Sequence, residues 1–140
     1  MSNLRPFHYA FPIKDLNDTV EFYTKVLGCT VGRSTDKWVD FNFFGHQITA
    51  HVTNKQSEFV AHNDVYGHSV PIAHSGVILD WSDWEILANN IKGHNISFII
   101  EPYVRFKNEP GEQATMFFKD PSGNALEFKA FKNDNAIFES

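Results

Sequence analysis

The stretch FFKDPSGNALEFKAF, residues 117–131, decides the fold of this 140-residue chain. Its middle, DPSGN at residues 120–124, combines the residue types that most favour a tight turn. Runs rich in apolar and aromatic residues flank that turn at residues 114–119 and 125–131, which predicts two paired strands. Glu127 lies in the second of these strands.

The sequence before this hairpin predicts a strand, a helix and a further strand. Residues 73–80 (AHSGVILD) have the composition of a strand, with His74 near its start. Apolar residues then recur at helical spacing until Gly93, and residues 96–100 predict the next strand. Residues 73–132 therefore form one predicted βαβββ module.

The same order of elements is predicted earlier in the chain. A strand at residues 7–13, with His8 inside it, is followed by helical spacing that ends at Gly28. Strands at 38–44 and 47–53 join at Gly45 and His46, and the pattern for a strand near 29–33 is weaker. We therefore predict an α+β fold in one domain spanning residues 1–140. Its first module covers residues 5–53, and an irregular connection, 54–72, leads to the second.

Composition excludes several classes of protein. Twelve Lys and Arg against seventeen Asp and Glu give a net charge of −5, which argues against nucleic-acid binding. No stretch approaches the ~20 apolar residues of a membrane span, so we expect a cytoplasmic protein that does not enter a membrane. Seven histidines accompany a single cysteine, Cys29, which excludes an internal disulfide and thiolate zinc fingers. A bound metal would therefore be held by imidazole and carboxylate.

Four residues occupy matching places in the two modules. His8 and His74 each begin a strand that leads into a helix, and His51 and Glu127 each lie in a closing strand. Strand alternation places His8, His51 and Glu127 opposite most of the apolar side chains of their strands. Facing sheets would bring the polar faces together around a divalent ion with open positions for substrate. Such ligands suit Fe(II), Zn, Ni, Mn or Co and do not choose among them.

The chain resembles the vicinal oxygen chelate superfamily, which includes glyoxalase I, extradiol dioxygenases and fosfomycin- and bleomycin-resistance proteins. The resemblance rests on the two-module plan, the opening HYAFPIKDLNDTVEFYTKVLGC and, above all, the D-P-x-G-N-x-x-E-F segment starting at Asp120. It implies that the two modules form a cupped mixed-sheet barrel with helices outside. It also implies a small-molecule substrate and a homodimer, with the metal site within one chain or shared between two.

The resemblance also implies which residues bind the metal. His8, His74 and Glu127 match the three most widely shared ligand positions. His51 lies near the fourth, where glyoxalase I carries a glutamate that also acts as the base, so this chain departs from simple glyoxalase I chemistry. His62 and His68, in the predicted connection, are expected to be solvated.

The segment EPYVRFKN, residues 101–108, alternates polar and apolar residues. Tyr103 and Arg105 are therefore candidate catalytic residues, Arg105 pairing with an anionic group and Tyr103 donating a proton or a hydrogen bond. The alternative for this segment is an edge strand or loop with solvated charges.

Two classes of function remain open. The first is a metal-dependent enzyme, either a dioxygenase or a glyoxalase-like lyase or isomerase, that chelates two adjacent oxygens of its substrate. The second is a non-catalytic protein that binds a drug or metabolite, as bleomycin-resistance members do. A third possibility is a metal-dependent transferase of the fosfomycin-resistance type.

Overall fold

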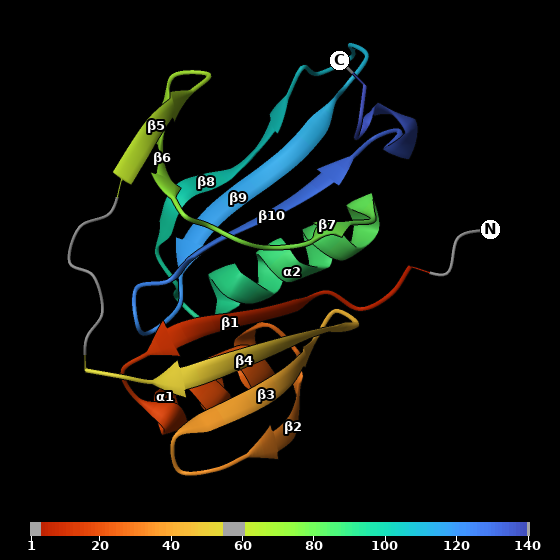
Figure 1. The fold of residues 1–140 in the computed structure, drawn as a ribbon. Helices are drawn as coiled ribbons and strands as arrows, with labels where there is room; N and C mark the ends of the chain where they lie inside the picture. Colours follow the sequence, from red (N-terminus) through yellow and green to blue (C-terminus); the bar gives the residue numbers. More distant parts are fainter. Residues whose placement is uncertain (1–3, 55–60, 140) are drawn as a thin grey trace. The chain divides into compact units, whose positions relative to one another are not determined.

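The computed structural model describes residues 4–54 and 61–139 and contains two four-stranded mixed sheets (Figure 1). The chain divides into two compact units, Met1–Glu58 and Phe59–Ser140, each with one of these sheets. The predicted α+β fold with two βαβββ-like modules is confirmed. Within the described residues, hydrogen bonds join strands only inside each sheet, so neither sheet is closed on itself into a barrel.

The first unit follows the predicted order of elements. It contains β1 (His8–Ile13), α1 (Leu16–Glu21), a π-helical turn η1 (Phe22–Val26), β2 (Thr30–Ser34), β3 (Trp38–Phe43) and β4 (His46–Val52). The order across the sheet is β1-β4-β3-β2, with β1 parallel to β4 and the other pairs antiparallel. The β3–β4 turn falls at Phe44 and Gly45, one residue earlier than predicted. Both residues have positive φ, 53° and 91°, as a two-residue hairpin turn requires.

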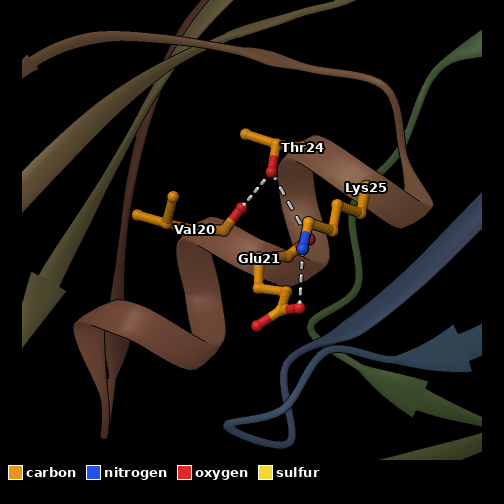
Figure 2. Close-up of polar contacts among 4 residues, drawn as sticks. All are labelled: Val20, Glu21, Thr24 and Lys25. Atoms are coloured by element: carbon orange, nitrogen blue, oxygen red, sulfur yellow. Dashed lines mark hydrogen bonds and ion pairs between the residues drawn. The ribbon is translucent and has the colours of Figure 1, made fainter.

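The helical segment of this unit is fixed by local side-chain hydrogen bonds. The Asp15 carboxylate accepts a hydrogen bond from the backbone N–H of Asp18 at 2.8 Å and caps α1. At the passage into η1, the Thr24 hydroxyl donates to the Val20 carbonyl at 2.7 Å, and Lys25 contacts Glu21 at 3.0 Å (Figure 2). A hydroxyl that bonds to the preceding turn often accompanies a local change in helix geometry.

Aromatic packing holds this helical segment against the sheet. Tyr23 is fully buried, and its ring lies 5.0 Å from that of Phe41 and 5.7 Å from that of Phe11. The core of the first unit therefore lies on the α1–η1 side of its sheet, which leaves the opposite face for polar residues.

The second unit begins with a separate hairpin and continues into the second sheet. It contains β5 (Ala61–Val65), β6 (His68–Ile72), β7 (Ile78–Leu79), α2 (Trp81–Gly93), β8 (Phe98–Arg105), β9 (Gln113–Lys119), β10 (Ala125–Phe131) and a short helix η2 (Asp134–Ala136). The order across the sheet is β7-β10-β9-β8, with β7 parallel to β10. Both sheets thus pair the strand before the helix with the last strand of the module.

Helix α2 covers one face of the second sheet. Trp84, Leu87 and Ile91 are buried on the helix, while Phe118 and Phe128 are fully buried on the sheet. The indole N–H of Trp84 donates to the Phe128 carbonyl at 2.9 Å, which fixes the helix against β10.

The turn predicted at residues 120–124 is confirmed and is held by one carboxylate. Asp120 Oδ1 accepts hydrogen bonds from the backbone N–H groups of Ser122 and Asn124, both at 2.9 Å. Its Oδ2 accepts from Asn124 Nδ2 at 2.9 Å, and Gly123 has the positive φ of 90° that glycine adopts at low cost. The turn fixes the register that pairs Glu127 with Phe117.

Two parts of the second unit differ from the sequence prediction. The connection predicted to be irregular contains the β5–β6 hairpin, because Tyr66 and Gly67 both adopt positive φ and form a two-residue turn. The strand predicted at 73–80 is reduced to β7 and one bridge between Ser75 and Leu126.

No helix among the described residues is long and apolar enough to cross a membrane.

Candidate metal centre

The face of the second sheet opposite α2 carries Thr115, Glu127 and Lys129 together with the apolar Phe117 and Ala125. These residues of β9 and β10 alternate with the residues that face the helix. The hairpin covers part of this face, where Val70 of β6 packs with Ile100 and Phe117. Glu127 is therefore buried although it does not face α2.

His74 and Glu127 lie in direct contact on this face. His74 Nε2 is 3.2 Å from Glu127 Oε1, and the His74 side chain is about one-third exposed while that of Glu127 is buried. The other carboxylate oxygen, Oε2, accepts a hydrogen bond from the hydroxyl of Thr115 at 2.5 Å. Thr115 is fully buried, so the carboxylate is fixed by a donor with little freedom to move.

The contacts of His74 determine which of its ring nitrogens faces the carboxylate as an acceptor. Its Nδ1 lies 2.6 Å from the Pro71 carbonyl, which can only accept a hydrogen bond, so Nδ1 carries the proton. In the neutral ring, Nε2 then directs a lone pair toward Glu127 Oε1. The ring also packs edge-on against Phe117, with centroids 5.0 Å apart, which limits its rotation.

This arrangement fits a divalent cation. Histidines that bind metals usually donate their second N–H to a carbonyl or carboxylate, as His74 does to Pro71. Two N/O ligands about 2.1 Å from one ion lie roughly 3.0–3.4 Å apart in octahedral or tetrahedral geometry. The observed 3.2 Å between His74 Nε2 and Glu127 Oε1 falls in this interval.

A glycine allows the chain after His74 to approach β10. Ser75 N donates to the Ala125 carbonyl at 3.3 Å, and Glu127 N donates to the Ser75 carbonyl at 2.8 Å. A Cβ atom on Gly76 would overlap the backbone oxygen of Glu127. The absence of a side chain at residue 76 is therefore necessary for the close approach that brings His74 to Glu127.

Tyr103 and Arg105 form a second cluster on the same sheet. Tyr103 of β8 pairs with Thr115 of β9, the residue that donates to Glu127. Arg105 Nε donates to the Tyr103 hydroxyl at 2.6 Å, and its guanidinium lies 5.4 Å from the ring centroids of both Tyr103 and Tyr66. The expectation that His68 is solvated is wrong, because His68 is half-buried in β6, with its ring 5.1 Å from that of Tyr103.

In the first unit, His8 has the same kind of support as His74. Its Nδ1 lies 2.9 Å from Gln47 Oε1, an amide oxygen that accepts, so Nε2 of the neutral ring carries the lone pair. His8 is exposed on the face of β1 opposite Phe11 and Ile13, as the alternation predicted. One ring nitrogen of His8 is therefore hydrogen-bonded to an acceptor, as is usual for a histidine that binds a metal through its other nitrogen.

His51 lies on the same face of the first sheet and is also exposed. The register pairs His51 with Pro12 and His8 with Gln47, a separation of four residues or roughly 13 Å along the strands. Between them, buried Asp40 accepts a hydrogen bond from the Thr49 hydroxyl at 2.6 Å and lies 3.7 Å from Arg33. The assignment of His51 as a ligand stays a prediction.

The structure thus brings two of the four predicted metal ligands, His74 and Glu127, into contact. It separately brings the two predicted catalytic residues, Tyr103 and Arg105, into contact, and both pairs lie within the second unit. Among residues 4–54 and 61–139, no group of three or more His, Cys, Asp or Glu side chains gathers at one point. Sequence reasoning missed Thr115 and Tyr66. Thr115 could have been found from strand phase, because its spacing across the 120–124 turn places it near Glu127 on the same face.

Cys29 takes no part in either cluster. It is buried beside the first unit's helical segment, and burial raises the pKa of its thiol from 9.0 to about 12. A thiol with this pKa stays protonated at neutral pH and is a poor nucleophile and metal ligand.

A model of a known protein family matches most of the chain. The family model of the Glyoxalase/Bleomycin resistance protein/Dioxygenase superfamily matches residues 5–128. A search of curated proteins gave no match.

Solved structures show the same fold over nearly the full length. A glyoxalase/bleomycin resistance protein/dioxygenase from Alicyclobacillus acidocaldarius is 28% identical with a TM-score of 0.78, and the match covers 95% of this chain and 96% of that one. The fosfomycin resistance protein FosX from Listeria monocytogenes is 18% identical with a TM-score of 0.68, covering 98% and 99%. A protein from the mobile metagenome of V. Pseudocholerae is 24% identical with a TM-score of 0.64, covering 95% and 97%.

Proposed function

Because the chain belongs to the glyoxalase/bleomycin resistance protein/dioxygenase superfamily, we propose that it is a divalent-metal-dependent enzyme acting on a small molecule. The reaction class is that of a dioxygenase or of a glyoxalase-like lyase or isomerase. The substrate presents two adjacent oxygens to the metal.

The observation that carries this proposal is the contact between His74 and Glu127. An imidazole nitrogen and a carboxylate oxygen lie 3.2 Å apart, and each group is held by a further hydrogen bond, His74 to Pro71 and Glu127 to Thr115. Two acceptors facing each other are unfavourable unless a proton or a cation lies between them. A cation satisfies both, and the supporting bonds to Pro71 and Thr115 are those expected of metal ligands.

The proposal assigns the remaining protein ligands to His8 and His51. His8 is supported by its hydrogen bond to Gln47, which leaves Nε2 available. The protein is proposed to act as a homodimer, and these two ligands come either from the same chain or from the partner copy. Separate variants of His8 and His51 test the two assignments independently.

A bound divalent ion would act as a Lewis acid that stabilises negative charge on the substrate oxygens. The protein's own residues supply the rest of the chemistry. Thr115 holds the Glu127 carboxylate in place, and His74 is fixed by Pro71 and Phe117. The Tyr103 hydroxyl accepts from Arg105, so its own proton is directed elsewhere and can be donated to the substrate.

A second function is favoured by the aromatic residues in the second unit. The rings of His68 and Tyr103 lie 5.1 Å apart, and those of Tyr66 and Phe106 lie 5.2 Å apart. A non-catalytic protein that binds an aromatic drug or metabolite would use such rings.

Metal analysis of protein purified without a histidine tag distinguishes the two functions. The enzyme predicts close to one equivalent of a transition metal in the wild type and a large loss in His74→Ala. The control is His94→Ala, an exposed histidine at the end of α2, which should keep the wild-type content. Less than about 0.3 equivalents in the wild type, unchanged in His74→Ala, would contradict the enzyme and favour the binder.

A further inference from the structure

Arg105 is a cation held in place with no ionic partner among residues 4–54 and 61–139. Neither the ion pairs Lys25–Glu21 and Arg33–Asp40 nor the His74–Glu127 contact includes Arg105. Its guanidinium lies 5.4 Å from each of two tyrosine rings, Tyr103 of the sheet and Tyr66 at the tip of the β5–β6 hairpin. A half-buried arginine fixed in this way has lost most of its freedom before any ligand binds.

Within the part of the chain that the structure describes, the two terminal nitrogens of the Arg105 guanidinium have no hydrogen-bond partner. An arginine side chain has five N–H donors, and the Nε–H is directed to the Tyr103 hydroxyl. The remaining donors, on the two terminal nitrogens, form the planar pair that binds a carboxylate or phosphate through two parallel hydrogen bonds. The Tyr103 hydroxyl occupies the Nε–H, and the Tyr66 ring lies 5.4 Å from the guanidinium, so neither tyrosine accepts a hydrogen bond from the terminal nitrogens.

The position of Arg105 relates it to the proposed metal ligands through the sheet itself. Arg105 pairs with Gln113, and Tyr103 pairs with Thr115, whose hydroxyl holds Glu127. Directly opposed residues in a sheet have Cβ atoms about 5 Å apart. Tyr103 is directly opposed to Thr115, and Thr115 contacts Glu127 diagonally, because the residue directly opposed to Thr115 on β10 is Lys129. These contacts link β8, β9 and β10 from the cation's strand to the candidate metal ligand Glu127.

We propose that Arg105 binds an oxyanion group, a carboxylate or a phosphate, on the substrate of this protein. Tyr103 and Tyr66 hold the guanidinium, so the β5–β6 hairpin is a specificity-determining element. The description of this ligand as the substrate rests on the proposed function, whereas the anion site itself rests only on the contacts of Arg105. A chain with a net charge of −5 does not attract anions as a whole, so the binding depends on this local cation.

Titration calorimetry with inorganic phosphate and, separately, acetate on metal-free protein tests the site at constant ionic strength. At least one anion should bind the wild type, and Arg105→Gln should weaken that binding about tenfold or more. Tighter binding of phosphate indicates a phosphorylated substrate, and tighter binding of acetate indicates a substrate with a carboxylate. Arg105→Lys keeps the charge but not the paired donors, so it should bind more weakly than the wild type.

Arg33→Gln is the matched control. Arg33 also lies near an aromatic ring, with its guanidinium 5.9 Å from the Trp38 centroid, but a carboxylate is already 3.7 Å away. This variant should bind the anion within about twofold of the wild type. Tyr66→Phe keeps the ring and the binding, while Tyr66→Ala should weaken the binding.

Equal anion affinity in the wild type and Arg105→Gln, or no binding of either anion to the wild type, would overturn the proposal. If Arg105→Gln does not fold, as judged by circular dichroism, Arg105→Lys and Tyr66→Ala decide the result. The metal content of the protein as purified, measured before the metal is removed for calorimetry, separates the two proposals. Arg105-dependent anion binding by a protein that is purified without metal supports the anion site and contradicts the metal-dependent enzyme, and the reverse result contradicts the anion site alone.

Discussion

His74 Nε2 lies 3.2 Å from Glu127 Oε1, although the two residues are 53 positions apart in the sequence. The contact depends on two features of β10: the turn at Asp120, which sets its register, and the close approach of the chain around Gly76.

Removing the hydroxyl that holds Glu127 should weaken metal binding without removing a ligand. Thr115→Val has nearly the same shape and eliminates the hydrogen bond to Oε2. Loss of a bond of this kind lowers metal affinity by roughly 10–100-fold, and the buried acceptor left unsatisfied costs about 1–3 kcal/mol of stability. Metal titration and urea unfolding measure the two effects.

Thr49→Val is the matched control for this change. Thr49 donates to buried Asp40 at 2.6 Å in the first sheet, as Thr115 donates to Glu127 in the second. We expect a similar loss of stability and a metal affinity within about twofold of the wild type. Equal effects of both variants on metal affinity would show that Thr115 acts only through stability.

A methyl group on residue 76 should be poorly tolerated. In Gly76→Ala the added carbon would overlap the Glu127 carbonyl, which is backbone and cannot rotate away. We expect a loss of about 3 kcal/mol or more in the free energy of unfolding. Gly93→Ala, at the end of α2 with open space around it, should be neutral or stabilising by up to about 1 kcal/mol. Similar stabilities of the two variants in urea unfolding would contradict the close approach.

The buried thiol gives a pH dependence with a definite sign. Burial raises the pKa of Cys29 to about 12 from 9.0, so the folded protein keeps a proton that the unfolded chain releases. The resulting contribution to stability is complete below about pH 9 and is lost as the pH rises toward 12. The melting temperature of the wild type should therefore fall more steeply than that of Cys29→Ala between about pH 9 and 11. Parallel curves, or rapid reaction of the native thiol with a thiol reagent at pH 8, would contradict the burial.

Local sequence rules predicted most of the fold. The Asp120 turn, the helix that begins after Asp15 and the alternation around His8 and Glu127 are all present, because each depends on residues close together in the chain. The β5–β6 hairpin was not predicted, since its polar strands lack a strong apolar alternation and its turn is formed by Tyr66 and Gly67. The short β7 reflects contacts with β10 that no local rule contains.

The candidate site was predictable in its residue types and less so in its contacts. Strand phase and the family resemblance selected His74 and Glu127, and their contact follows from the pairing of the chain around Ser75 with β10. The role of Tyr66 depends on a hairpin that brings it to Arg105, a long-range contact that sequence spacing does not reveal. The contact of Thr115 with Glu127 could have been predicted from the sequence, because the 120–124 turn fixes the register of the two strands that carry them.

The central claim is that His74 and Glu127 bind one metal ion, and a double-mutant cycle of Zn²⁺ affinity tests it most directly. By calorimetry, His74→Ala and Glu127→Gln should each raise the Kd about 100-fold, and the double variant should raise it by much less than the product of the two. Such coupling is expected when two groups share one ion. A Kd within about twofold of the wild type for each single variant would contradict the claim.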